Sequence, residues 1–179
     1  MDNVEAEQLF KLLFEAAPGF ISLFFLRRTD RLAERAVCET ADYIEAARYA
    51  LTKTEAGFDS YFSPAVLANR PKAGGRGKKE DFLGSRTLWV DVDATTHHPA
   101  DEILRRLTGF QPPPSVVVHS GNGFHGYWLL RELITDKPAV EAANRWLAQE
   151  LGGDQCFSID HVLRVPGTLN YKGRAVKRD

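Results

Sequence analysis

Hydrophobic and polar positions follow two different spacings along the 179 residues of this chain. Apolar residues recur at helical spacing in four stretches, and short runs rich in β-branched and aromatic residues are typical of strands. The pattern predicts helices over residues 6–17, 40–53, 99–109 and 137–151. It predicts strands over residues 20–26, 58–67, 86–93, 115–120 and 124–130, and a strand with a turn over 161–172. Strands alternating with helices predict an α/β fold.

The stretch from 115 to 130 departs from this alternation. Its two apolar strands are separated by Gly121-Asn122-Gly123, a sequence typical of a β-hairpin. A βαβ unit followed by a hairpin and a further helix predicts a ferredoxin-like (RRM-like) sheet that contains antiparallel strands. We therefore expect one domain over 1–179, with an N-terminal α/β module (1–80) and an RRM-like module (81–179).

Composition agrees with a folded globular domain and points to one charged segment. The chain is 44% hydrophobic and 26% charged, and its 23 basic and 24 acidic residues leave a formal net charge of −1. Residues 70–79 nevertheless carry five positive charges and three glycines. We expect a loop there that is poorly ordered without a ligand and can hold phosphate groups; a solvated loop without a partner is the alternative.

Cysteine content and hydropathy indicate a reducing, aqueous environment. Cys38 and Cys156 are far apart and form no CxxC pattern, so free thiols are favoured over a disulfide. No apolar run is long enough to span a bilayer, and the run at 20–26 is followed by charged residues, as expected of a buried strand. These features predict a soluble cytoplasmic protein.

Two acids, Asp91 and Asp93, end the predicted strand at 86–93. Side chains two apart on a strand share a face, so the two carboxylates converge while Val90 and Val92 turn to the core. Carboxylates so close together resist double ionisation unless a cation lies between them, and oxygen ligands suit Mg²⁺ or Mn²⁺. The alternative is that Asp93 caps the next helix or turn and Asp91 is only an acid at the end of the strand.

Two further segments carry candidate chemistry. In residues 119–128 glycines allow backbone amides to approach an anion, and Ser120 and His125 could add donors or a positive charge; a plain tight hairpin is the alternative. In residues 154–172, Asp160 could join a metal site, and Arg164 and Lys172 could contact phosphate. A strand cap with a surface salt bridge is the alternative there.

The segments "WVDVD", "SGNGFH" and "SIDHVLRVPGTLN", in this order, resemble the archaeo-eukaryotic primase superfamily. Within it they resemble most the primase–polymerase domains of plasmid, phage and mobile-element replication proteins. The resemblance covers about residues 58–172. It implies the archaeo-eukaryotic primase fold, and metal-dependent, template-directed nucleotidyl transfer from NTPs or dNTPs that starts or extends primers.

The resemblance also implies roles for individual residues. The metal-binding catalytic acids match Asp91, Asp93 and Asp160, with Asp154 a second candidate for the third acid. The residues expected to hold the incoming nucleotide are Ser120, Gly121, Gly123, His125, Arg164 and Lys172. Two ions, Mg²⁺ or Mn²⁺, are the expected cofactors.

The expected macromolecular partner is a single-stranded DNA template, and a helicase domain or subunit is a further expected partner. The template backbone would be held by the basic loop, through Arg70, Lys72, Arg76, Lys78 and Lys79. The chain departs from the family in one respect, because two distant cysteines with the adjacent His97 and His98 do not make a zinc site. We expect this histidine pair in a solvent-facing loop or helix start.

Two other functions remain open from the sequence. A non-catalytic module that binds single-stranded nucleic acid would have no use for converging acids. A rolling-circle nicking protein would need a histidine–hydrophobic–histidine motif and a tyrosine nucleophile on a helix, whereas His97 and His98 are adjacent and Tyr127 falls in a predicted strand. Trp89 and Trp128 also fall in predicted strands and are expected in the core.

Overall fold

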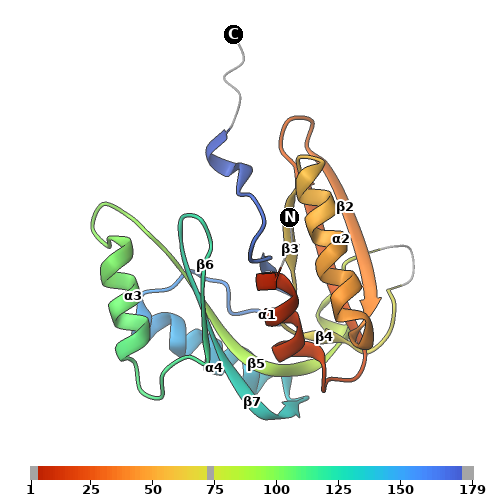
Figure 1. Cartoon of the computed structure of the whole chain (residues 1–179). Coiled ribbons are helices and arrows are strands. Elements are labelled where there is room, and N and C mark those ends of the chain that lie inside the picture. The colour runs from red at the N-terminus through yellow and green to blue at the C-terminus, as the bar shows by residue number, and fades with distance from the viewer. Residues whose placement is uncertain (1–3, 72–74, 175–179) are drawn as a thin grey trace.

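The computed structural model describes residues 4–71 and 75–174. Within them the strands form one sheet in the order β6-β7-β5-β4-β1-β3-β8, with β2 paired to β1. Every strand pair is antiparallel. Helices cover the sheet in two groups, α1 with α2 and α3 with α4 (Figure 1). The expected α/β fold with an antiparallel-containing sheet is confirmed.

The N-terminal half contains α1 (Val4–Phe14), β1 (Phe20–Arg27), β2 (Leu32–Glu39), α2 (Tyr43–Glu55) and β3 (Asp59–Phe62). Alternate residues of β1 point to opposite faces. Ile21, Leu23 and Phe25 are fully buried in the core that also contains side chains of α1 and α2. Phe24, on the other face of β1, stays partly exposed.

The second half contains β4 (Val66–Leu67), β5 (Phe82–Asp93), α3 (Ala100–Gly109), β6 (Val116–His119), β7 (Gly123–Ile134), α4 (Lys137–Leu151) and β8 (Leu163–Arg164). β5 connects the halves, because its first residues pair with β4 and the others with β7. Val90 and Val92 pack with α3 and α4, as expected. Trp89 belongs to the larger core, and its face of β5 also carries Asp91 and Asp93.

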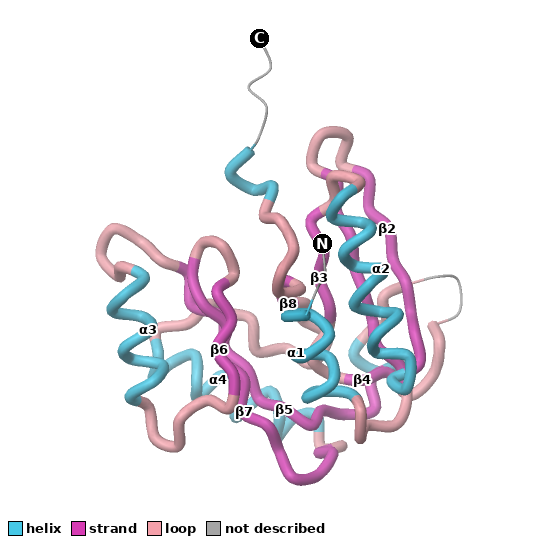
Figure 2. The backbone as a smooth tube through the Cα atoms, viewed as in Figure 1, coloured by secondary structure: helices cyan, strands magenta, loops and turns pink. Residues whose placement is uncertain are grey.

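The elements from β5 to β8 follow the RRM-like order, but the last strand, β8, does not pair within this module. β8 pairs with β3 and not with β5. The backbone of β5 is instead satisfied by α4 and the segment after it: Asn144 Oδ1 accepts from the Trp89 amide at 2.9 Å, and the Asp154 amide donates to Asp91 O at 2.7 Å. Beyond α4 the chain is mostly loop and runs between the two halves of the sheet (Figure 2).

Several local expectations are confirmed, and one strand was not predicted. Trp89 and Trp128 are buried, and neither cysteine is in a disulfide. His97 and His98 are exposed in a turn before α3. The predicted strand at 58–67 is interrupted at Ser63-Pro64, and that at 161–172 shortens to β8. The unpredicted strand is β2. No helix among residues 4–71 and 75–174 is long and apolar enough to cross a membrane.

Candidate active site

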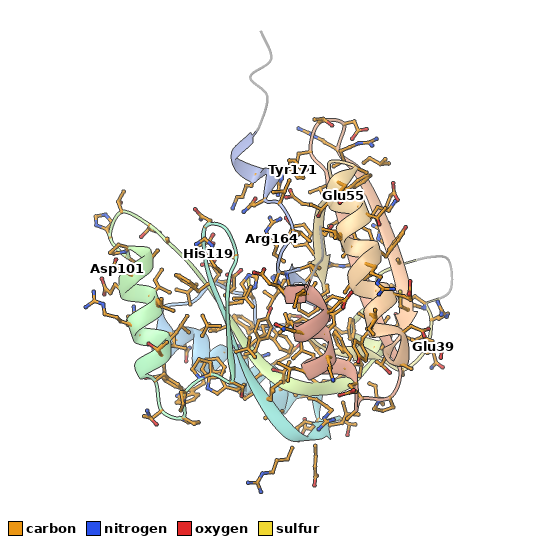
Figure 3. The ribbon with its side chains drawn as sticks, in the orientation of Figure 1. Glu39, Glu55, Asp101, His119, Arg164 and Tyr171 are labelled. Atoms are coloured by element: carbon orange, nitrogen blue, oxygen red, sulfur yellow. The ribbon has the colours of Figure 1, made fainter. Side chains whose placement is uncertain are left out.

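A pocket opens where the two halves of the sheet meet the segment after β8. Six of the residues selected from the sequence line it together: Asp91, Asp93, Ser120, His125, Arg164 and Lys172. They come from β5, the β6–β7 hairpin and the C-terminal segment. Four further polar residues line the same pocket: Arg28, Tyr61, Asn122 and Asn170. Figure 3 shows Arg164 and Tyr171 on the segment that passes between the halves.

The carboxylates of Asp91 and Asp93 form the acidic side of the pocket. Asp91 lies opposite His125 across the β5–β7 pair. Asp91 Oδ1 is buried and has no hydrogen-bond partner among the described residues, and His125 Nε2 is 3.5 Å away. Burial, then the charges of Asp93 and Asp154, raise the pKa of Asp91 to about 7. A buried carboxylate oxygen without a partner beside a second carboxylate fits a bound cation.

His125 is held between the acids and the core. The residue is 2% exposed, and Nδ1 lies 3.3 Å from the hydroxyl of Tyr127. Burial and the nearby charge of Arg164 lower the pKa of His125 to about 3. Of the two roles considered for this residue, the structure therefore favours a neutral ring that donates an N–H over a positive charge.

The glycines of the β6–β7 turn serve backbone geometry. Gly121 has a φ of +93°. Gly123 pairs with Asp93, and a Cβ there would collide with the carbonyl of Val92. Neither glycine lines the pocket, whereas Ser120 and Asn122 do. The lack of a side chain at Gly121 and Gly123 is needed for the turn and for close strand pairing.

Two arginines form the basic side of the pocket around a buried acid. Asp59 is fully buried. It accepts from Arg164 Nη1 at 2.9 Å and from the Tyr171 amide at 2.8 Å, and it also forms an ion pair with Arg28. The Tyr61 hydroxyl lies 3.1 Å from Arg164 Nη2 and 3.2 Å from Arg28 Nη2. One carboxylate thus orients two guanidinium groups, and a net positive charge remains.

The C-terminal segment ties the hairpin to the basic side. Asn170 Nδ2 donates to the carbonyl of Ser120 at 3.4 Å, and Lys172 N donates to Asn170 Oδ1 at 2.9 Å. Lys172 is exposed, and its charge opposes the rise in the pKa of Asp91. Four of the residues expected to hold a nucleotide therefore meet here from segments far apart in the chain: Ser120, His125, Arg164 and Lys172.

Asp160 does not join the acidic pair. It lies outside the pocket lining, and its carboxylate accepts a hydrogen bond from Ser158 in a turn that Glu141 of α4 also holds. The structure thus brings Asp91 and Asp93 together in the pocket and leaves Asp160 outside the pocket lining. Asp154, the second candidate, is electrostatically coupled to Asp91 and to Asp93. Even so, no group of three His, Cys, Asp or Glu side chains in the described parts of the chain is arranged as a metal site.

Sequence reasoning missed Arg28, Asp59 and Tyr61. A signal for Asp59 was present, since an acid inside an apolar strand needs a partner when it is buried. Arg28 follows the last residue of β1, where a charged residue is easily taken for a solvent-exposed strand end. Nothing local indicates that the three residues meet Arg164.

The residues of the basic loop lie in different environments. Arg70 bonds to the carbonyl of Val37 and stacks on Phe20. Lys79 pairs with Glu141 at 2.8 Å. The remaining members are Arg76, which is partly buried, Lys78, which is exposed, and Lys72, which lies outside the described residues.

Three solved structures of primase domains share this fold. The crystal structure of primase RepB′ matches with a TM-score of 0.64 and 16% identity, covering 96% of this chain and 53% of that chain. The archaeo-eukaryotic primase domain of the cyanophage S-2L primase–polymerase matches with a TM-score of 0.65 and 16% identity, covering 94% and 84%. The catalytic domain of RepB′ in complex with initiator DNA gives 0.60 at 16% identity, covering 95% and 80%. The chain thus has the fold of archaeo-eukaryotic primase domains.

Sequence comparison narrows this class to one family. The family of RepB DNA-primase N-terminal domains matches residues 33–179, and the chain belongs to it. A replication protein from Clostridium perfringens is 29% identical over 108 residues, which is 54% of this chain and 27% of that protein. The chain therefore spans about a quarter of this relative and about half of the RepB′ chain.

Proposed function

We propose that this chain is the catalytic primase–polymerase domain of a replication protein, which joins nucleotides to a primer on a DNA template. The observation that carries the proposal is the pocket itself. It sets two carboxylates, one with a buried and unpaired oxygen, against two arginines, a lysine and several neutral donors. This combination suits a divalent cation bound to a triphosphate.

The acidic side would hold Mg²⁺ or Mn²⁺ through Asp91 and Asp93. Mg²⁺ is commonly bound by one or two carboxylates together with substrate phosphates and water, so a third carboxylate in contact is not required. Asp154 would add negative charge nearby. The ions would make the attacking 3′ hydroxyl more acidic and neutralise the pyrophosphate that leaves.

The basic side would bind the triphosphate. Arg164 and Arg28 are oriented by Asp59 and Tyr61, and paired guanidinium groups match phosphate oxygens well. Lys172 adds a mobile positive charge, since it is exposed. Ser120 and neutral His125 supply donors from the opposite wall.

The substrates would be NTPs or dNTPs on a single-stranded DNA template. The RepB′ catalytic domain, which has this fold, was solved with initiator DNA. Arg70, Lys72, Arg76, Lys78 and Lys79 remain candidates for contacts with the template backbone. Nicking chemistry through Tyr127 is disfavoured, because this side chain is fully buried.

A primer-synthesis assay on single-stranded DNA tests the proposal. Labelled NTPs or dNTPs are supplied with Mg²⁺ or Mn²⁺, and products are sized on a gel. The wild type should extend primers only with a divalent ion, and Asp93→Asn should reduce synthesis by about two orders of magnitude or more. Asp101→Asn, an exposed acid on α3, is the matched control and should keep wild-type synthesis. Full synthesis by Asp93→Asn would contradict the catalytic role.

A further inference from the structure

The face of β1, β2 and β3 that turns away from α1 and α2 carries aromatic and arginine side chains. Phe24 lies at the centre of this face and is partly exposed. In the sheet register it is flanked by Arg35 on β2 and Tyr61 on β3. Residues paired across strands share a face, so the three side chains lie side by side.

Contacts between side chains extend the row formed by Arg35, Phe24 and Tyr61 in both directions. The guanidinium carbons of Arg35 and Arg76 each lie 5.8 Å from the centre of the Phe24 ring. The rings of Phe24 and Tyr61 are 6.1 Å apart, and Arg164 lies 4.9 Å from the Tyr61 ring. Since Tyr61 and Arg164 line the pocket, the row is continuous from the edge of the sheet to the candidate active site.

The charge of this face is positive. Glu34 of β2 pairs with Lys53 of α2, on the helix-covered side. Asp30 at the tip of the β1–β2 hairpin pairs with Arg27. Two acids lie on the Phe24 side of the sheet: Asp59 is buried and shared by two arginines, and Glu39, opposite Phe20 at the end of β2, is exposed. Near the start of β1 the loop that contains Arg76 crosses this face of the sheet. There the Ser22 hydroxyl donates a hydrogen bond to the carbonyl of Arg76 at 2.6 Å.

We propose that this row, named here the Phe24 face (Phe24, Arg35, Tyr61 and Arg76), binds the single-stranded DNA template and leads it into the pocket; this rests on the proposed function. Every base has an aromatic face that can stack on Phe24 or on a guanidinium plane, and the arginines attract the phosphates. The partly exposed ring, the surplus positive charge and the continuity with the pocket favour an unpaired strand. Binding is tolerant of sequence, since no base edge is read.

Fluorescence anisotropy with a labelled oligothymidylate, without nucleotide or metal, tests this surface. Phe24→Leu should weaken binding by roughly tenfold, because stacking is lost while an apolar side chain is kept. Arg35→Ala should weaken binding and lower the slope of log affinity against log salt by about 0.7, as expected for one lost phosphate contact on a single strand. Wild-type affinity and slope in both variants would overturn the proposal.

Matched control residues lie on α2, which covers the opposite face of these strands. Tyr49→Leu and Arg48→Ala change an aromatic and an arginine on α2, and both residues are exposed. These controls should bind DNA as the wild type does, and equal losses in controls and test variants would overturn the assignment. Thermal melts show that each variant is folded.

Photocrosslinking of the unmutated protein gives a test that does not depend on variant folding. Oligothymidylate carrying 5-iodouracil should crosslink to peptides that contain Phe24 or Tyr61, and crosslinks confined to other peptides would overturn the proposal. A failure of the proposed catalytic function would give a different result. The protein would then bind and crosslink DNA at the Phe24 face, but it would synthesise no primer with any nucleotide or divalent ion.

Discussion

Arg164 Nη1 donates to Asp59 Oδ1 at 2.9 Å across 105 residues of sequence. This ion pair joins β8 to β3, which are also paired in the sheet. Asp59 is fully buried and Arg164 nearly so, hence neither charge can turn to water when its partner is removed. The pair therefore contributes to the stability of the fold and also fixes one wall of the pocket.

Replacing Asp59 should lower the stability of the fold by more than the loss of one hydrogen bond would. Asp59→Asn leaves the charges of Arg164 and Arg28 without a counterion, and breaking a buried pair typically costs about 3–5 kcal/mol. We expect a loss of this size in the free energy of unfolding measured with urea. Asp30→Asn breaks the exposed pair with Arg27 and should stay close to the wild type, because water screens that pair. Equal effects of the two substitutions would contradict the structural role of Asp59.

Arg164→Lys keeps the charge but loses the fork of donors. A lysine cannot bond to Asp59 and Tyr61 and also present a planar group to phosphate. We expect nucleotide affinity, measured by calorimetry with Mg²⁺ present, to fall by roughly tenfold. Arg105→Lys, in the exposed pair with Asp101 on α3, is the control and should bind as the wild type does. Unchanged affinity of Arg164→Lys would show that the fork is not used.

The raised pKa of Asp91 predicts a dependence of stability on pH. The folded state binds this proton more tightly than the unfolded state, so stability is full below the ordinary value of 3.8 and falls as the pH rises to about 7. Asp91→Asn removes the effect and should be more stable than the metal-free wild type above about pH 7, with the difference vanishing in acid.

A divalent ion should reverse this loss in the wild type. Mg²⁺ or Mn²⁺ bound to the ionised carboxylate raises the melting temperature by mass action, and more so at higher pH. The Asn variant should show little such shift. Thermal melts over a range of pH and ion concentration measure both effects. An equal Mg²⁺ shift in wild type and Asp91→Asn would contradict metal binding at Asp91.

Close packing at Gly123 predicts a cost for adding a single methyl group. In Gly123→Ala the new Cβ meets the backbone of Val92, which cannot move without disturbing Asp93. We expect a loss of about 1–3 kcal/mol in the free energy of unfolding. Gly109→Ala, at the end of α3, adds the same atom where nothing lies within 4 Å and should be neutral or slightly stabilising. Similar melting temperatures for the two variants would contradict the close strand pairing.

The sequence predicted those elements whose signal is local. The two-residue period of β5 placed Asp91 and Asp93 on one face and Val90 and Val92 on the other, because neighbouring side chains on a strand point in opposite directions. The proline at position 138 and the N-cap at Asp136 mark the start of α4, whose predicted range of 137–151 agrees with the structure. These features depend only on residues near one another in the chain.

What could not be predicted depends on distant partners. β2 lies on one side of β1 with much of its surface exposed, so it lacks the apolar alternation of a half-buried strand. Asp160 matches a motif, but its carboxylate accepts a local hydrogen bond from Ser158 and lies outside the pocket lining. The meeting of Asp59 with Arg28 and Arg164 follows from the strand order of the sheet, which no local pattern encodes.

The segment after β8 has a consequence for how the protein matures during synthesis. Asn170 reaches the hairpin at Ser120, and the Tyr171 amide reaches Asp59, so these late residues bridge two surfaces made much earlier. A nascent chain that still holds residues 165–172 inside the ribosome has all the strands of the sheet outside but lacks the bridge. The pocket is therefore completed late, when this stretch emerges and docks.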